Sequence, residues 1–196
     1  MGINLSKGQT IDLKKRDGGT LSYATLGLGW DAKVVEHRGF FGGVKKVQQN
    51  IDLDASALLC SGRTVQEIVY WGQLVSGDGT VRHLGDNLTG EGEGDDETIQ
   101  IVLDGLPPAI DAVYLVVNSY SGETFSEIDN AFVRVLDPAA GDTELVRYEL
   151  SEAGPHTAMI MAKLTRGAAG WTITAIGQKA EGRTAQELQS AVTAML

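Results

Sequence analysis

A run of acidic residues between positions 86 and 97 is the part of the sequence best suited to chemistry. Two carboxylates about 4 Å apart repel by about 1 kcal/mol in bulk water, and by more near a protein surface. A hard divalent cation offsets this repulsion, because it takes about six to eight oxygen ligands from carboxylates, amides and carbonyls. Glycines at 90, 92 and 94 let the backbone turn toward such an ion. The run contains no Lys, Arg or His, and its acids are Asp86, Glu91, Glu93, Asp95, Asp96 and Glu97.

This acidic run does not follow the EF-hand pattern. Counting from Asp86, the third and fifth positions are Leu88 and Gly90, where an EF-hand loop carries oxygen-bearing side chains. A cation site here must therefore have another geometry. A solvated acidic loop that binds nothing is the alternative interpretation. The alternating glycines, the neighbouring Asn87 and the acidic residues upstream argue against that alternative.

Three further groups of polar side chains come close to the ends of predicted strands. Asp31 ends one strand, and Asp52 and Asp54 share one face of another, because side chains alternate along a strand. That face is opposite the apolar residues at 51, 53 and 55, so we expect both acids to avoid that core. The third group is Asn118, Ser119, Glu123 and Asp129. Together with the acidic run, these groups offer enough oxygens for two neighbouring calcium ions.

Charge and cysteine content exclude several classes of protein. The acidic run supplies six of the ten net negative charges, whereas nucleic-acid binding requires a basic patch. Cys60 is the only cysteine, which excludes an internal disulfide and a thiolate zinc site. The first ten residues lack the apolar segment of a signal peptide, and no stretch approaches about eighteen apolar residues. We expect a cytoplasmic protein without a membrane span, and peripheral membrane contact stays open.

Short β-branched or alternating runs separated by Gly, Asp, Ser and Pro dominate the chain. About ten such strands with one clear helix predict a mainly all-β fold, an antiparallel β-sandwich of two sheets. The capping box at 184–187 and the apolar spacing after it predict an amphipathic helix over 185–195, packed on the sandwich or on a partner. We therefore divide the chain into a sandwich over 1–180 and a C-terminal helix over 181–196. The predicted strands are 10–13, 21–28, 51–59, 64–70, 97–103, 112–118, 131–136, 145–150, 157–164 and 171–177.

Residues 33–50 form a basic insertion between two predicted strands. Lysines and arginines outnumber the single acid, Glu36, and glycines flank Phe40 and Phe41. One interpretation is a mobile hairpin or loop. The other is a contact arm with an aromatic tip, because two exposed Phe side chains are costly unless they pack on something.

Six stretches of the sequence form a distinctive set. Besides the acidic run, they are NLSKG, GLGWD, DLDASA, NAFVRV and RYELS, at 4–8, 27–31, 52–57, 130–135 and 147–151. In this order they resemble the TerD (tellurium-resistance) family over roughly residues 1–177, and the acidic run is the most specific of them.

The resemblance implies a calcium-binding β-sandwich, loosely like a C2 domain, with two ions at one edge. It also implies a non-enzymatic role in bacterial tellurite resistance or general stress response, with protein partners of the same stress system. The ligands that it assigns to calcium are Asp31, Asp54, Asp86, Asn87, Glu91, Glu93, Asp95 and Asp96. Asp52 and Glu97 stand outside this assigned set.

The chain departs from the family pattern at two places. Residues 70–73 read Tyr-Trp-Gly-Gln where the family has an aromatic pair followed by two asparagines, so an asparagine ligand is lost. Residues 119–121 read Ser-Tyr-Ser where a carboxylate is expected. These departures leave the number of bound ions, one or two, open.

Two other functions compete with a calcium-binding module. The carboxylates could hold magnesium in a phosphoester hydrolase or phosphotransfer enzyme, but His37, His83 and His156 lie in unrelated segments and indicate no general base. Cys60 could chelate tellurite directly, although a single thiol is poor equipment for stoichiometric detoxification and a buried Cys is usually inert.

Overall fold

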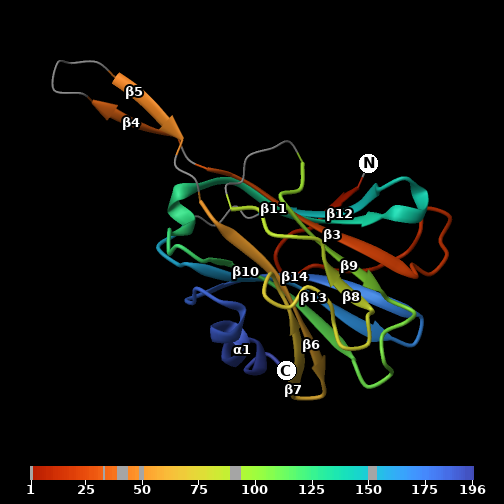
Figure 1. Cartoon of the computed structure of the whole chain (residues 1–196). Coiled ribbons are helices and arrows are strands. Elements are labelled where there is room, and N and C mark those ends of the chain that lie inside the picture. Colours follow the sequence, from red (N-terminus) through yellow and green to blue (C-terminus); the bar gives the residue numbers. More distant parts are fainter. Residues whose placement is uncertain (1, 33, 39–43, 49–50, 89–93, 150–153) are drawn as a thin grey trace.

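Two six-stranded sheets pack face to face in the computed structural model, which describes residues 2–32, 34–38, 44–48, 51–88, 94–149 and 154–196 (Figure 1). β1 pairs with β12 in parallel, and the other neighbours within the two sheets run antiparallel. The first sheet has the order β1 (Ile3–Asn4), β12 (Thr143–Glu149), β11 (Ile128–Asp137), β3 (Tyr23–Ala32), β9 (Glu97–Val102), β8 (Val81–His83). The second has the order β2 (Thr10–Asp12), β14 (Gly170–Ala180), β13 (Ala158–Gly167), β10 (Ala112–Ser119), β6 (Leu53–Ser61), β7 (Thr64–Val69).

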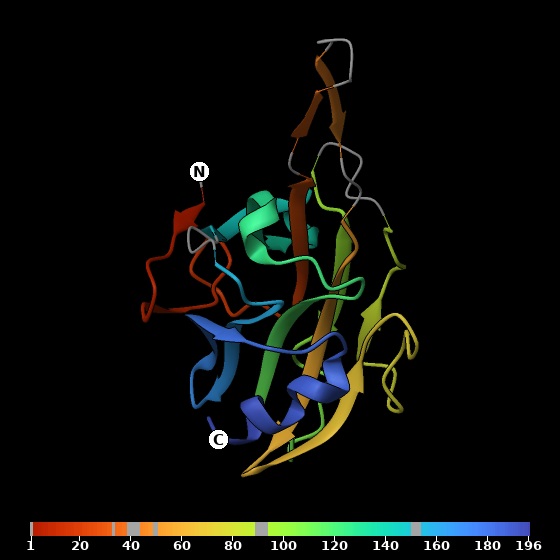
Figure 2. The same cartoon turned by 90° about the vertical axis from the view of Figure 1, so that its left-hand side faces the viewer.

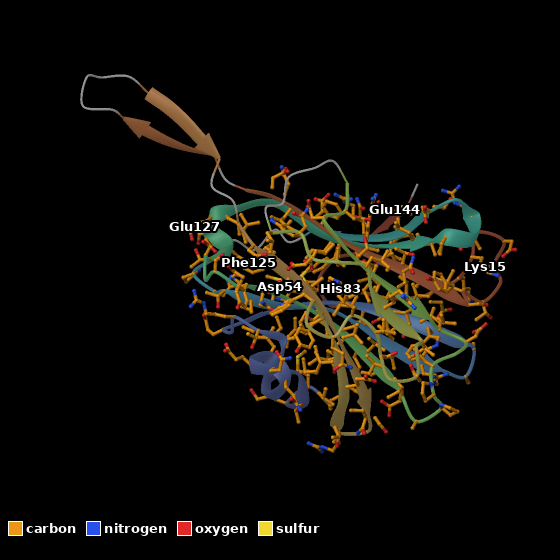
Figure 3. All side chains as sticks on the ribbon, viewed as in Figure 1. Lys15, Asp54, His83, Phe125, Glu127 and Glu144 are labelled. Atoms are coloured by element: carbon orange, nitrogen blue, oxygen red, sulfur yellow. The ribbon has the colours of Figure 1, made fainter. Side chains whose placement is uncertain are left out.

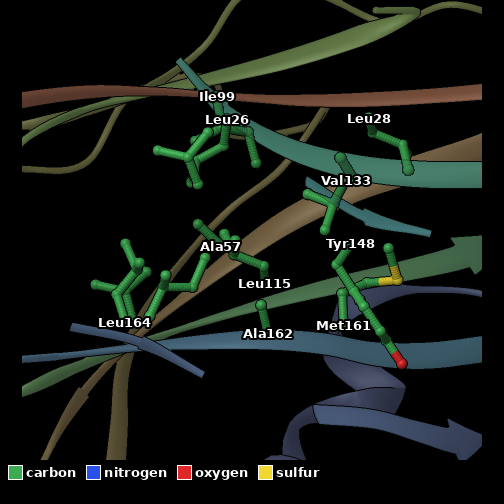
Figure 4. Packing of buried hydrophobic residues seen from close by; sticks show 14 of the residues in the cluster. Leu26, Leu28, Ala57, Ile99, Leu115, Val133, Tyr148, Met161, Ala162 and Leu164 are labelled. Carbon is green, nitrogen blue, oxygen red and sulfur yellow. The ribbon is translucent and has the colours of Figure 1, made fainter. Parts of the chain in front are cut away.

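The main core lies between the facing sides of the two sheets. Strand β9 shows how the sequence builds it, because Glu97, Ile99 and Ile101 are buried while the residues between them are partly exposed. Period-two alternation turns every second side chain inward. Figure 4 shows Leu26 and Ile99 of the first sheet opposite Ala57 and Leu115 of the second.

A second, smaller core lies on the outer face of the second sheet, beneath helix α1 (Ala185–Thr193). The Thr184 side chain accepts a hydrogen bond from the N–H of Glu187, which begins the helix. The Tyr114 hydroxyl donates to the carbonyl of Met195 at 3.0 Å and fixes the end of the chain to β10. Leu188 and Val192 are fully buried against Leu58, Cys60, Tyr114 and Val116.

The insertion between β3 and β6 is a β-hairpin with its own two-stranded sheet, β4 (Val34–Arg38) and β5 (Val44–Gln48). Both views show these strands standing apart from the sandwich (Figures 1 and 2). Phe40 and Phe41 lie outside the described residues, so the predicted aromatic tip stays a prediction.

The predicted architecture is confirmed: two sheets and a C-terminal helix, which lies on its own sandwich. The helix ends at Thr193, two residues earlier than expected. β1 and β8, of two and three residues, were missed, whereas β2, which also has three residues, was predicted because its alternation continues to Leu13. Among the described residues, no helix is both long and apolar enough to cross a bilayer.

Candidate metal centre

Three carboxylates meet at the end of the sandwich where β6 begins. Asp52 immediately precedes β6, Asp54 belongs to it, and Asp86 follows β8 in the other sheet. One carboxylate oxygen from each residue lies within 4.8 Å of the other two. We call these three residues the aspartate cluster, and Figure 3 marks Asp54 within it. Ligand oxygens so close together are spaced as a shared divalent ion requires.

Pairing between β6 and β10 positions the cluster. Asn118 is the antiparallel partner of Asp54, and its Nδ2 donates to Asp54 Oδ2 at 2.8 Å and to the Arg183 carbonyl at 2.8 Å. The N–H of Tyr120 donates to the Asp52 carbonyl at 3.1 Å. Both aspartates stand on the face opposite the main core, as expected. However, Asp54 is only 3% exposed, because this face is covered near Asn118 and Arg183.

Burial and mutual repulsion raise the pKa values of the two β6 aspartates. The pKa of Asp52 rises to about 6, first through desolvation and then through the charges of Asp86, Glu97 and Glu123. The pKa of Asp54 rises to about 7 through desolvation and the nearby Glu97, although the Asn118 hydrogen bond opposes the rise. A cation would reverse these shifts, since an opposite charge favours the ionised carboxylate.

Two buried oxygens in and beside the cluster have no hydrogen-bond partner among the described residues. They are Oδ1 of Asp52 and Oδ1 of Asn118. An unsatisfied buried acceptor costs about 1–3 kcal/mol, so a partner at this place stabilises the fold. Both are oxygens of the kind that calcium takes as ligands. The aspartate cluster and Asn118 therefore fit a hard divalent cation.

Glu97 is already engaged by protein groups. Its Oε2 accepts from the N–H of Ala55 at 2.6 Å and lies 3.3 Å from Nε2 of His83, while its Oε1 accepts from the N–H of Asn87 at 3.3 Å. Burial raises the pKa of Glu97, and the hydrogen bonds from His83 and Ala55 oppose the rise. Glu97 thus connects β6, β8 and the loop after β8 next to the aspartate cluster.

Three other predicted ligands, Asp31, Asp95 and Asp96, are not members of this cluster. Asp95 forms a bidentate ion pair with Arg134, at 2.7 and 3.1 Å. Asp96 accepts from the N–H of Trp30 at 2.9 Å and from Nδ2 of Asn87 at 3.0 Å. Asp31 is exposed and accepts from Nδ2 of Asn130 at 2.7 Å. Glu91 and Glu93 lie outside the described residues.

Asp31 and Asp96 line a pocket of about 310 Å³ on the first sheet, the second place where carboxylates gather. The pKa of Asp96 is raised, mainly by desolvation and then by the charges of Asp31 and Asp95. We call this cavity the Arg147 pocket; it is lined by Trp30, Asp31, Gly94, Asp96, Asn130, Phe132 and Arg147. The predicted ligands therefore separate into two groups, with Asn87 hydrogen-bonded toward both Asp96 and Glu97.

Asn118 is the residue whose position sequence reasoning undervalued. It belongs to the third polar group of the sequence, but the predicted set of ligands does not include it. The strand register that puts Asn118 beside Asp54 would have indicated it, yet register between strands about sixty residues apart is not legible in the sequence.

Comparisons with known proteins agree with this architecture. The TerD domain model matches residues 1–190. The chain is 40% identical to tellurium resistance protein TerZ of Serratia marcescens, over 96% of this chain and 95% of that protein. It is 42% identical to stress response protein SCP2 of Bacillus subtilis (strain 168), over 91% and 92% of the two chains.

The fold is also similar to two solved structures. One is a homologue of telluride resistance protein (TerD) from Streptomyces coelicolor A3(2), with a TM-score of 0.65 at 23% identity, over 83% of this chain and 92% of that one. The other is SAV2460, a protein titled as of unknown function, with a TM-score of 0.69 at 20% identity, over 87% and 96%. These two likenesses support the two-sheet sandwich fold, and this structure adds a carboxylate cluster that could hold a metal. The chain belongs to the TerD family of tellurium-resistance and stress-response proteins.

Proposed function

We propose that this protein is a calcium-binding, non-enzymatic module of a bacterial tellurite-resistance and general stress-response system. One observation carries the proposal: the aspartate cluster gathers three carboxylates beside two buried oxygens that have no partner in the described chain. Calcium suits this donor set, because it accepts carboxylate and amide oxygens in flexible geometry. The names of the relatives, among them stress response protein SCP2, support the system in which the module works.

Calcium would act here by changing the surface that a protein partner meets. Five exposed apolar or aromatic side chains stand on the loops beside the cluster, and contacts link these loops. The rings of Trp71 and Tyr120 lie 5.8 Å apart edge to face, and the N–H of His83 donates to the Leu74 carbonyl at 2.8 Å. Neutralising the acids of the cluster beside these side chains favours docking of an apolar partner surface. The five side chains are Trp71, Leu74, Leu84, Leu88 and Tyr120.

The alternative is a magnesium-dependent phosphoester hydrolase or phosphotransfer enzyme. The environment of His83 favours the non-enzymatic proposal, because this side chain is 2% exposed and already contacts Glu97. Direct chelation of tellurite by Cys60 is disfavoured too, since burial beneath α1 and the nearby Asp111 raise the pKa of its thiol to about 11. The enzyme would be favoured if the protein hydrolysed phosphoesters faster with magnesium than with calcium.

Calcium titration by calorimetry tests the proposal directly. We expect one or two ions per chain, and a melting temperature that rises with calcium and falls on chelation. Stabilisation is about 2.7 kcal/mol when free calcium is a hundred times Kd. The variant Asp104→Asn should bind calcium as the wild type does, because this exposed aspartate follows β9 at the far end from Glu97. No heat and no melting shift at millimolar calcium would refute the proposal.

A further inference from the structure

Three of the stretches singled out in the sequence, 27–31, 130–135 and 147–151, converge on the Arg147 pocket, which the proposed function leaves unexplained. Strand pairing brings them together: Arg134 of β11 is opposite Arg147 of β12 on one side and Gly27 of β3 on the other. The guanidinium of Arg147 lies over the Phe132 ring, 3.6 Å from its centre. The pocket thus holds a cation stacked on an aromatic ring, and the carboxylates of Asp31 and Asp96 line the same pocket.

Two neighbouring arginines of this sheet have different tasks. Arg134 is held by Asp95, because both of its hydrogen bonds to this carboxylate are short, at 2.7 and 3.1 Å. Within the described chain, the ion pairs of Arg147 are long, at 3.6 Å to Glu144 and 3.4 Å to Glu149, and both of those carboxylates are more exposed than Asp95. Stacking on Phe132 restrains the guanidinium while leaving its donors weakly engaged. A pre-oriented guanidinium with spare donors is suited to bidentate binding of an oxyanion.

We infer that the Arg147 pocket binds a small oxyanion, with Arg147 donating to two of its oxygens. Phosphate monoesters and free tellurite share this chemistry: several oxygens around one central atom, with negative charge. The pocket volume of about 310 Å³ is at the lower end of small-molecule sites, which suits a ligand of this size. The amide of Asn130, which now donates to Asp31, supplies a second donor at the same place.

The inference rests on the proposed function, because Asp31 and Asp96 repel an anion until a cation neutralises them. These two carboxylates are predicted calcium ligands and line the same pocket as Arg147, so a second calcium ion held by them, apart from the one in the aspartate cluster, would turn their repulsion into attraction. Oxyanion binding is therefore expected in the calcium-loaded protein and not after chelation. The dependence is reciprocal: the anion should also tighten calcium binding by the same factor.

The experiment is calorimetry on the full chain in two stages. Calcium is titrated first, and the calcium-loaded protein is then titrated with methyl phosphate or with sodium tellurite, each against a protein-free calcium blank. We expect at least one of the two anions to bind with a stoichiometry of one. Binding of methyl phosphate identifies a phosphate monoester as the ligand class, and binding of tellurite alone identifies the free oxyanion.

Variants assign the binding to Arg147. Arg147→Gln should weaken it about tenfold or more, and Arg147→Lys should weaken it less, because lysine keeps the charge but loses the fork. Arg63→Gln, at the exposed β6–β7 turn, should leave it unchanged. If calcium does not bind, the proposed function and the oxyanion site both fall. If calcium binds but neither anion does, or if Arg147→Gln binds as the wild type does, only the oxyanion site is refuted.

Discussion

The Glu97 carboxylate of β9 accepts a hydrogen bond from the N–H of Ala55 in β6 at 2.6 Å, which joins the two sheets at the acidic end. β7 pairs with β6 only from Ala57 onward, so Ala55 lies beyond the reach of that neighbouring strand. The Glu97 carboxylate thus accepts the hydrogen bond that a carbonyl of a neighbouring strand would otherwise accept. Because the same carboxylate also contacts His83 and Asn87, its loss would leave several buried groups unsatisfied.

Replacing Glu97 should therefore destabilise the protein by removing an acceptor rather than a metal ligand. For Glu97→Ala we expect a loss of about 2 kcal/mol or more in the free energy of unfolding, because each orphaned buried donor costs about 1–3 kcal/mol. Glu97→Gln keeps one oxygen for Ala55 and should lose less. Urea denaturation with chelator measures both variants. Equal losses in the two would contradict the role assigned to the acceptor.

Asp54→Asn should have the opposite effect on the calcium-free protein. The pKa of Asp54 is raised to about 7 mainly by burial, so the ionised side chain is poorly accommodated without a cation. An asparagine keeps an oxygen for Asn118 and removes the charge. We expect unchanged or higher stability in chelator and at least a tenfold weaker calcium affinity, about 1.4 kcal/mol. Melting curves with and without calcium measure both effects, and an undiminished calcium shift would exclude Asp54 as a ligand.

The same two aspartates predict how stability depends on pH. The folded-state pKa values of Asp52 and Asp54, about 6 and about 7, lie above the ordinary value of 3.8. Their contribution to stability is therefore complete below about pH 4 and is lost as the pH rises through 6 to 7. Calcium affinity should rise over the same interval, because binding displaces protons.

Urea denaturation between about pH 5 and pH 8 tests this dependence, and Asp54→Asn is its control. In chelator the stability of the wild type should fall with rising pH, whereas the variant should show a flatter curve. With saturating calcium the fall should be reduced or reversed. A calcium-free stability that rises across this interval would mean that burial and neighbouring charges do not raise the pKa values of the two aspartates.

Much of the fold could be predicted because it depends on local patterns. Alternation in 97–103 identified β9, and the capping box at 184–187 identified α1. Short pieces were missed: β8 has three residues and pairs with β9 over only that length. Its burial pattern is clear in the fold but too brief to read beforehand.

The site could be predicted only in part, because it depends on pairings between distant strands. Asp54 and Asp86 were expected together, and their carboxylates are close. Asp95 was expected beside them, but Arg134, thirty-nine positions later, holds it elsewhere. Composition indicates that many acids must gather near a cation. It does not indicate which of them an arginine from another strand will take, and the ligand set itself stays a prediction.

Helix α1 provides a last prediction, which concerns packing. Leu188 is fully buried against the outer face of the second sheet, where Leu58 and Cys60 are also fully buried. Leu188→Ala should cost about 2–4 kcal/mol, because the vacated volume cannot collapse completely. A weakened helix should open more often and expose Cys60, so we expect the thiol to react faster with an alkylating reagent under native conditions.

Ala194→Gly serves as the control for this variant, because Ala194 is exposed and follows the last residue of the helix. It should change neither the stability nor the alkylation rate appreciably. Calcium should slow the reaction of the wild type only if metal binding stabilises β6 as a whole, since Asp54 and Cys60 lie on the same strand. Rapid alkylation of the wild type itself would contradict a helix packed firmly over this face. In that case the burial that raises the pKa of the Cys60 thiol would also be incomplete.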